Sequence, residues 1–386
     1  MRPWPQRRMS RRTWLGSAGA LLLAACGVTT LGRDAGSGLA PQLGPVALLG
    51  GRVWHEGATE PAGVLSDGGS ILAVGPDVAA RDAATTIDCT GLVLLPGFVD
   101  THVHVRFARA QDVLLGGVTT VRDLGSTPED RAAWQGVPVT VRAAGRILTP
   151  LGGYPTRSWG GRGESREVAD ADDARAAVDE QVAAGAVIVK IALEDSGGRP
   201  LFAPDVLAAA VDAAHAAGLR VTAHVGTADG LRLALDASVD ELAHLPLYAI
   251  GEDEAADLAM AGMALCPTLA IRGRDDGATR AVAAFREAGG RVLYSTDLGN
   301  GGTRPGIMGE EFAALRAAGM SAAEVVDAAT VEAADHLGLD RVGRVEPGWR
   351  ADVIGVAVDP AGDEPLDAEH VRVVVAGGRP VRTDPA

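Results

Sequence analysis

The spacing of apolar residues changes character twice along the chain. Residues 44–95 and 348–384 carry short β-type apolar runs separated by Gly and Pro, without helical segments between them. Residues 96–347 instead alternate short apolar runs with Ala-rich segments, in which apolar positions recur with the period of a helix. This pattern predicts an α/β domain over residues 96–347 and a small composite β-sandwich domain built from both ends of the chain.

The central region contains eight short apolar runs that we predict as strands. They span residues 99–105, 119–124, 137–144, 186–193, 220–225, 240–245, 264–269 and 291–296. Eight βα units over about 245 residues match a (β/α)8 TIM barrel in count and size. A doubly wound open sheet is the alternative fold, but no Gly-x-Gly-x-x-Gly sequence follows a first strand.

The first 25 residues have the organisation of an export signal. A basic start containing Ser10-Arg11-Arg12 precedes an apolar run over residues 18–25 and is similar to a twin-arginine signal peptide. The run ends at Leu23-Ala24-Ala25-Cys26, which resembles a bacterial lipobox, so we expect cleavage before Cys26 and lipidation of its sulfur. Residues 26–43, rich in Gly, Ser and Pro, predict a flexible linker. We expect tethering to the outer face of the bacterial cell membrane; an uncleaved membrane anchor is the alternative.

Charge and composition narrow the possible partners. The formal net charge of −15 disfavours nucleic acid as a partner. Apolar residues make up 47% of the chain and aromatic residues 4%, which predicts an interior of Ala, Val and Leu. Besides Cys26, the chain has Cys89 and Cys266, which both lie next to predicted strands in apolar surroundings. We predict that these two are buried free thiols.

A His-x-His pair lies on the first predicted strand of the central domain. His102 and His104 share one face of this strand with Asp100, because alternate side chains of a strand point the same way. Two imidazoles at this spacing can bind one metal ion, and imidazole suits zinc, manganese, iron and nickel. Asp100 either fixes the tautomer of a histidine ring or makes a hydrogen bond at the strand end.

Other polar residues mark the later predicted strands, whose carboxyl ends meet at one rim of a barrel. These residues are Lys190, His224, His244 and Asp297. Lys190 is the single lysine of the chain, and a buried strand is a costly place for an ammonium group. Unlike arginine, lysine can become a neutral amine. Such an amine can add carbon dioxide and form a carbamate that bridges two metal ions; an ion pair with a barrel carboxylate is the alternative.

Several motifs together resemble the amidohydrolase superfamily across residues 44–384, and most closely its imidazolonepropionase-like and prolidase-like branch. They include Pro96-Gly97-Phe98-Val99-Asp100-Thr101-His102-Val103-His104, Val189-Lys190, Thr222-Ala223-His224, Glu241-Leu242-Ala243-His244 and Ser295-Thr296-Asp297. The resemblance implies that His102, His104 and Asp297 hold one divalent metal. It implies that His224 and His244 hold a second, both ions being zinc by preference. Carboxylated Lys190 and a hydroxide would bridge the two.

This resemblance implies hydrolysis of an amide-type C–N bond in a small-molecule substrate. The candidates are a dipeptide, an N-acyl amino acid or a cyclic amide, attacked by the bridging hydroxide. Asp297, beside the hydroxide, would be the proton shuttle. A deaminase or a lactonase/esterase on the same scaffold is the alternative, as is a surface-tethered lipoprotein that binds without turnover.

The long segment after the third predicted strand, residues 148–170, is expected to be a functional loop. Related enzymes often have Gly-Gly-His where this chain has Gly152-Gly153-Tyr154. We predict that Tyr154, Arg157 and Arg162 contact substrate, with an arginine recognising a carboxylate. An exposed, merely solvated loop is the alternative. The remaining histidines are expected to be surface or packing residues: His55, His215, His336 and His370.

Overall fold

The computed structural model describes residues 44–273 and 275–384. The predicted signal peptide, Cys26 and the linker over residues 26–43 lie outside these residues. Within the described ranges, no helix combines the length and the apolar character that crossing a bilayer requires.

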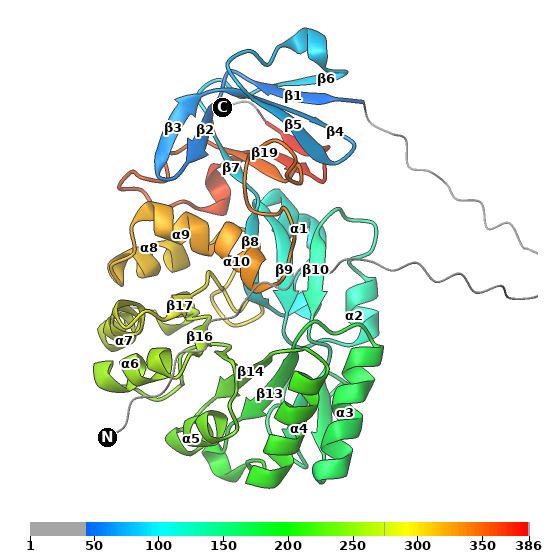
Figure 1. Ribbon diagram of the computed structural model, residues 1–386, viewed down its shortest axis with the longest axis vertical. Coiled ribbons are helices and arrows are strands. Elements are labelled where there is room, and N and C mark those ends of the chain that lie inside the picture. The colour runs from blue at the N-terminus through cyan, green and yellow to red at the C-terminus, as the bar shows by residue number, and fades with distance from the viewer. Residues whose placement is uncertain (1–43, 274, 385–386) are drawn as a thin grey trace, which may run out of the picture. The chain divides into compact units, whose positions relative to one another are not determined.

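Two β-sheets are formed near the ends of the described chain. One has the strand order β5-β4-β1-β6 and the other β20-β19-β18-β7-β2-β3. Their bounds are β1 (Val46–Leu49), β2 (Arg52–His55), β3 (Ala58–Pro61), β4 (Gly63–Asp67), β5 (Ser70–Gly75), β6 (Thr85–Asp88), β7 (Val93–Pro96), β18 (Val353–Val356), β19 (Val371–Ala376) and β20 (Arg379–Thr383). Figure 1 shows β2 and β7 close to β19.

The six-stranded sheet joins the two chain ends directly. β7 pairs in parallel with β2 and antiparallel with β18, with Leu95 opposite Ile354. Apolar side chains of both sheets, among them Leu48, Leu94 and Val373, form one buried cluster. Strands from both ends therefore share a sheet and a core, while the sandwich form and the boundaries of this domain stay predictions.

The central region alternates parallel strands with helices. Its strands are β8 (Phe98–Val103), β9 (Val118–Asp123), β10 (Thr140–Ala143), β11 (Ile147–Pro150), β12 (Ser165–Val168), β13 (Val189–Leu193), β14 (Val221–Val225), β15 (Glu241–Leu242), β16 (Ala264–Leu265) and β17 (Arg291–Val292). Its α-helices are α1 (Ala110–Leu115), α2 (Pro128–Ala132), α3 (Ala171–Ala183), α4 (Pro204–Ala216), α5 (Ala228–Asp236), α6 (Glu252–Met260), α7 (Asp276–Glu287), α8 (Gly309–Ala317), α9 (Ala322–Ala328) and α10 (Val331–His336).

Helix α3 illustrates how local sequence sets these elements. The Asp170 carboxylate accepts hydrogen bonds from the backbone N–H groups of Asp172 and Asp173, and so caps the start of the helix. Its buried residues, Ala174, Ala177, Val178 and Gln181, recur at helical spacing. After the helix, Gly185 adopts a φ of 79°, which glycine tolerates best and which ends many helices.

The parallel strands lie in two sheets, whereas the prediction was one closed barrel. The sheets have the orders β10-β9-β8 and β12-β11-β13-β14-β15-β16-β17. Backbone hydrogen bonds cross both gaps: Val187 N donates to Ala143 O at 3.0 Å, and Thr101 N to Tyr294 O at 3.1 Å. The expectation of a loop throughout residues 148–170 was wrong, because β11 and β12 occupy its two ends.

A buried ion pair connects the two parallel sheets of this region. Both Nη atoms of Arg122 in β9 donate to the Glu241 carboxylate in β15, at 2.6 and 2.9 Å. Both side chains are 0% exposed. His336 contacts the same carboxylate at 2.6 Å, and Arg122 also donates to Cys266 at 3.0 Å. Cys266 and Cys89 are buried and free, as predicted.

The Arg122→Met substitution is expected to destabilise the protein by about 3–5 kcal/mol, because it leaves the Glu241 carboxylate buried without its main counter-charge. Urea unfolding followed by circular dichroism measures this change. The Arg280→Ala substitution removes an ion pair with Glu252 whose two side chains are both 62% exposed, and is expected to change stability by less than about 1 kcal/mol. Equal effects of the two substitutions would contradict the expectation.

Candidate metal centre

Three buried side chains form the first ligand cluster. His102 lies in β8, His104 follows that strand, and Asp297 comes after β17. The Asp297 Oδ1 atom lies 3.2 Å from His102 Nε2 and 3.3 Å from His104 Nε2. Asp297 has a φ of 52°, a left-handed conformation that is uncommon outside glycine and clusters at functional sites. The structure thus brings together the three residues predicted to hold the first metal.

The tautomer of His102 makes this cluster suitable for a cation. His102 Nδ1 lies 2.5 Å from the Ala243 carbonyl oxygen, which can only accept, so Nδ1 carries the proton and Nε2 presents a lone pair. Burial lowers the pKa of His102 well below its ordinary value, so the ring is neutral. His102 Nε2 and Asp297 Oδ1 are buried acceptors without a hydrogen-bond partner in the described chain. Two buried acceptors this close are stable only when a cation lies between them. A nitrogen and an oxygen donor of this kind fit a divalent metal.

His224 and His244 form a second group at the ends of neighbouring strands. His224 lies in β14 and His244 follows β15, and His224 Nδ1 is 2.7 Å from His244 Nε2. His244 Nδ1 lies 2.7 Å from the Leu245 carbonyl oxygen, which leaves a lone pair on its Nε2. Burial lowers the pKa of both rings, that of His244 to about 3. Both rings are therefore neutral and suited to metal binding.

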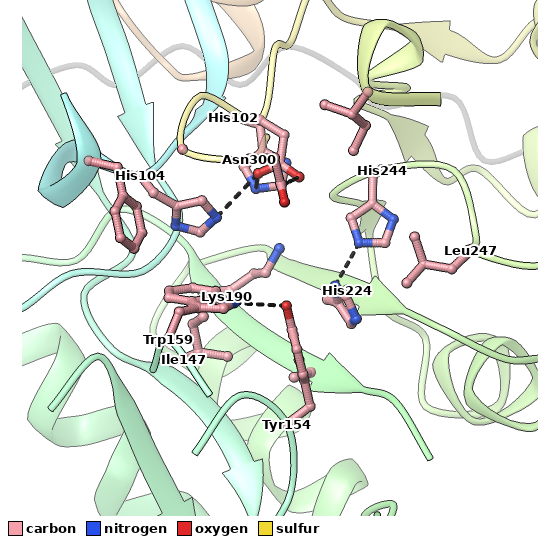
Figure 2. A pocket seen from close by; sticks show the side chains of 15 residues that line it. His102, His104, Ile147, Tyr154, Trp159, Lys190, His224, His244, Leu247 and Asn300 are labelled. Atoms are coloured by element: carbon pink, nitrogen blue, oxygen red, sulfur yellow. Dashed lines mark hydrogen bonds and ion pairs between the residues drawn. The ribbon is translucent and has the colours of Figure 1, made fainter. Parts of the chain in front are cut away.

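Lys190, in β13, lies between the two groups. Figure 2 shows its amine pointing into the space bounded by His102 and His104 on one side and by His224 and His244 on the other. The side chain is buried, and burial lowers the pKa of the amine to about 8. The charges of Asp297 and Glu241 act against this shift, and an ion pair with a barrel carboxylate stays the alternative to the carbamate.

A cavity of about 260 Å³ opens onto both groups. Apolar side chains form much of its wall: Phe107, Ile147, Trp159, Leu247 and Ile271. Tyr154 also lines it, and its ring stacks on His224 with centroids 4.5 Å apart. The Tyr154 hydroxyl accepts a hydrogen bond from Trp159 Nε1 at 2.8 Å. Tyr154 therefore lies at the site, as predicted, beside the candidate ligand His224.

The two loop arginines do not line this cavity. Arg157 and Arg162 are both exposed, and neither is among the lining residues. The buried acid of this segment, Glu164, pairs with Arg106, which follows β8. Arg106 also donates to the Trp159 carbonyl oxygen at 3.3 Å, so this arginine holds the segment in place.

Two acidic residues and an amide complete the surroundings. Asp100 accepts hydrogen bonds from the backbone N–H groups of His102 and Thr296, both at 3.1 Å, so of the two predicted roles the structure shows the strand-end hydrogen bond. Burial raises the pKa of Asp100 to about 7.

The sequence prediction missed Asn300, which donates to Asp297 Oδ2 at 2.5 Å, and Glu194, which faces His224. Glu194 directly follows the strand that carries Lys190, and Asn300 lies three residues after Asp297. Their positions just beyond strand ends are the sequence feature from which both could have been predicted.

The four remaining histidines lie outside the cavity lining. His215, His336 and His370 contact Asp240, Glu241 and Glu364 respectively, and His55 is exposed. These positions agree with surface or packing roles.

The chain belongs to the amidohydrolase family, whose model it matches over residues 93–381. The uncharacterized protein Rv2915c of Mycobacterium tuberculosis is 32% identical over 329 residues, which cover 74% of this chain and 84% of that protein. A solved Xaa-Pro dipeptidase with bound methionine aligns with a TM-score of 0.72 at 23% identity, over 88% of this chain and 100% of the other. Ochratoxinase of A. niger aligns with a TM-score of 0.73 at 21% identity, over 89% and 97% of the two chains.

Family membership and these alignments imply an α/β fold of the TIM-barrel type. The family also supports a hydrolase acting on C–N bonds, and the cluster of His102, His104 and Asp297 supports metal binding. The amidohydrolase family predicted from sequence is thereby confirmed, whereas the imidazolonepropionase-like and prolidase-like branch stays a prediction. Export, lipidation, the carbamate and the number and identity of the metals stay predictions.

Proposed function

We propose that this protein hydrolyses an amide-type C–N bond of a small, mainly apolar substrate at a centre of two divalent metals. The observation that carries the proposal is the pair of buried candidate ligand groups, His102-His104-Asp297 and His224-His244, with the Lys190 amine between them. Zinc suits this nitrogen and oxygen donor set. When bound, two such ions would supply a nucleophilic water near neutral pH and polarise the substrate carbonyl.

The side chains of this chain provide the remaining chemistry. In its neutral form the Lys190 amine can add carbon dioxide: the nitrogen forms a bond to carbon, one C=O π bond opens, and the proton released from nitrogen passes to water, which leaves an anionic carbamate with two donor oxygens. The Asp297 carboxylate lines the cavity, so it can accept a proton from the attacking water and pass it to the leaving nitrogen. Asn300 donates to Asp297 Oδ2 and so orients the carboxylate for this transfer.

The cavity wall favours a neutral, apolar group next to the scissile bond. Phe107 and Leu247 line the cavity and are 45% and 48% exposed, so the entrance as well as the wall is apolar. Among the described lining residues, Lys190 is the one lysine or arginine, and it faces the candidate ligand groups. We therefore rank a neutral amide or cyclic amide above a dipeptide or an N-acyl amino acid, which would need a partner for a carboxylate.

Paired substrates test this preference. An N-acyl phenylalaninamide is expected to have a higher kcat/KM than the N-acyl phenylalanine with a free carboxylate. The Trp159→Ala substitution is expected to raise KM for the neutral substrate by about tenfold, because about 1.5 kcal/mol of apolar burial is lost. The Leu151→Ala substitution is the matched control, since this exposed apolar side chain of the same segment is outside the cavity lining.

Substitution of the loop arginines tests the opposite expectation, that the substrate carries a carboxylate. If Arg157→Ala or Arg162→Ala raised KM for carboxylated substrates alone, the carboxylate hypothesis would replace the preference for neutral amides. Esters, lactones and amino-purines belong in the same screen, because fold and metal site do not determine which carbonyl or amino compound reacts.

The proposal includes three statements that rest on sequence patterns. We propose that the eight βα units close into a single barrel, and that the chain-end sheets form a sandwich. The hydrogen bonds across both sheet gaps and the shared core of the end sheets support these two statements. We also propose export and anchoring through a lipidated Cys26, supported by the lipobox-like sequence before it.

A further inference from the structure

Glu194 is a buried carboxylate beside the second ligand group. It follows β13, the strand that carries Lys190, and is 5% exposed. Its Oε2 atom lies 3.5 Å from His224 Nε2, and its Oε1 atom accepts a hydrogen bond from the Ser196 backbone N–H at 2.7 Å. Burying a carboxylate costs free energy unless a partner compensates its charge. We therefore asked what the Glu194 carboxylate does for His224, the candidate ligand that it faces.

His224 needs an acceptor at the nitrogen that faces Glu194. Its Nδ1 atom faces His244 Nε2, and can bind a metal only if it carries a lone pair rather than a proton. The proton must then be on Nε2, which is buried and makes no hydrogen bond within the described chain. The facing acceptor is Glu194 Oε2, at a separation that a small movement of either side chain shortens to a hydrogen bond.

The surrounding backbone leaves a place for this carboxylate. A Cβ atom on Gly226, just beyond β14, would lie 1.7 Å from Glu194 Oε2, so only glycine admits the carboxylate there. The φ of Gly226 is not in the left-handed range, so the close approach, not the backbone conformation, requires the glycine. On the other side, the Tyr154 ring stacks on the face of His224. Tyr154 thus holds the plane of the imidazole while Glu194 faces its edge.

We propose that Glu194 is a positioning residue for the second metal: it holds the proton on His224 Nε2 and leaves Nδ1 free to bind the ion. A carboxylate that orients a metal-binding histidine in this way typically strengthens metal binding by 10–100-fold (order of magnitude). This inference rests on the two-metal centre of the proposed function, but it concerns metal binding and not the substrate.

Metal titration of the full chain tests the role of Glu194. Zinc or cobalt is added to metal-depleted protein, and the stoichiometry and affinity of both ions are measured, with the cobalt absorption spectrum reporting each site. The Glu194→Ala substitution is expected to weaken the second ion by about 10–100-fold and to leave the first unchanged. Glu194→Gln, which can still accept from Nε2, is expected to be intermediate. His244→Ala provides the reference spectrum for a protein without the second ion.

Two further variants separate positioning from a general structural effect. Gly226→Ala keeps the carboxylate but displaces it, and is expected to weaken the second ion as Glu194→Ala does. Asp195→Asn alters the adjacent acid, whose Oδ1 atom makes no hydrogen bond within the described chain, and is expected to bind both ions normally. Circular dichroism and thermal unfolding establish that each variant is folded.

The outcomes distinguish this inference from the proposed reaction. If folded Glu194→Ala protein bound both ions as tightly as wild type, or lost both equally, the positioning role would be overturned. A wild-type protein that binds only one ion would overturn it too. If no amide is hydrolysed but Glu194→Ala selectively weakens the second ion, the proposed reaction fails while the positioning role stands.

Discussion

The Lys190→Arg substitution is expected to lower kcat/KM for any amide substrate by at least ~10³-fold, the scale at which a group acting directly on the transition state is lost. Arginine stays positively charged and cannot add carbon dioxide. It would place a fixed cation between His102-His104-Asp297 and His224-His244, where cations are expected to bind. The variant is therefore also expected to bind less than the wild-type amount of metal, which elemental analysis measures in the same preparation.

The carbamate itself has a direct signature. Because Lys190 is the single lysine, ¹³C-labelled bicarbonate is expected to give one side-chain carbamate signal in the NMR spectrum of the wild type and none in Lys190→Arg. The Lys190→Ala variant leaves space at the same place, so a short carboxylic acid is expected to restore part of its metal content and activity. Full activity with both ions in Lys190→Arg would refute the carbamate and the bridging role of this residue.

The sequence was sufficient to place the candidate ligand groups together because of one general property of parallel strands. Their carboxyl ends meet at one rim, so His102, His224, His244 and Asp297 could be placed together without knowledge of the loops. Lys190 had a separate signal, since this chain otherwise uses arginine for every basic side chain. The structure brings these five residues to one cavity.

What the sequence could not supply are contacts that depend on backbone groups and on loop direction. The tautomer of His102 is set by the Ala243 carbonyl, a contact that no side-chain pattern marks. Arg157 and Arg162 are exposed, and no sequence pattern indicated this. The acid of the same segment, Glu164, pairs instead with Arg106, and no motif links these two residues. The lengths of three strands were overestimated, because β15, β16 and β17 each have only two residues. The apolar sequence continues beyond the paired residues of each strand, so apolar character alone does not mark where the pairing ends.

The Asp297→Asn substitution is expected to lower kcat/KM by about 10²–10⁴-fold, the range that general acid–base groups contribute. Asparagine has almost the same shape but cannot accept a proton from the attacking water or return one to the leaving nitrogen. Because Asp297 is also a candidate ligand with Oδ1 near His102 and His104, metal content is measured in the same samples, and rates are compared per metal-loaded protein.

The dependence on the leaving group separates the two roles of Asp297. A group that only holds metal slows all substrates by a similar factor, whereas a proton donor matters most when the leaving nitrogen is strongly basic. We therefore expect Asp297→Asn to slow an alkyl amide more than a nitroanilide, and a nitrophenyl ester least of all, because its leaving oxygen departs without a proton. Asn300→Ala, which removes the hydrogen bond to Oδ2 but keeps the carboxylate, is the matched control and is expected to show a smaller loss with the same order. An equal loss on all three substrates would assign Asp297 to metal binding alone and require another proton carrier in the cavity.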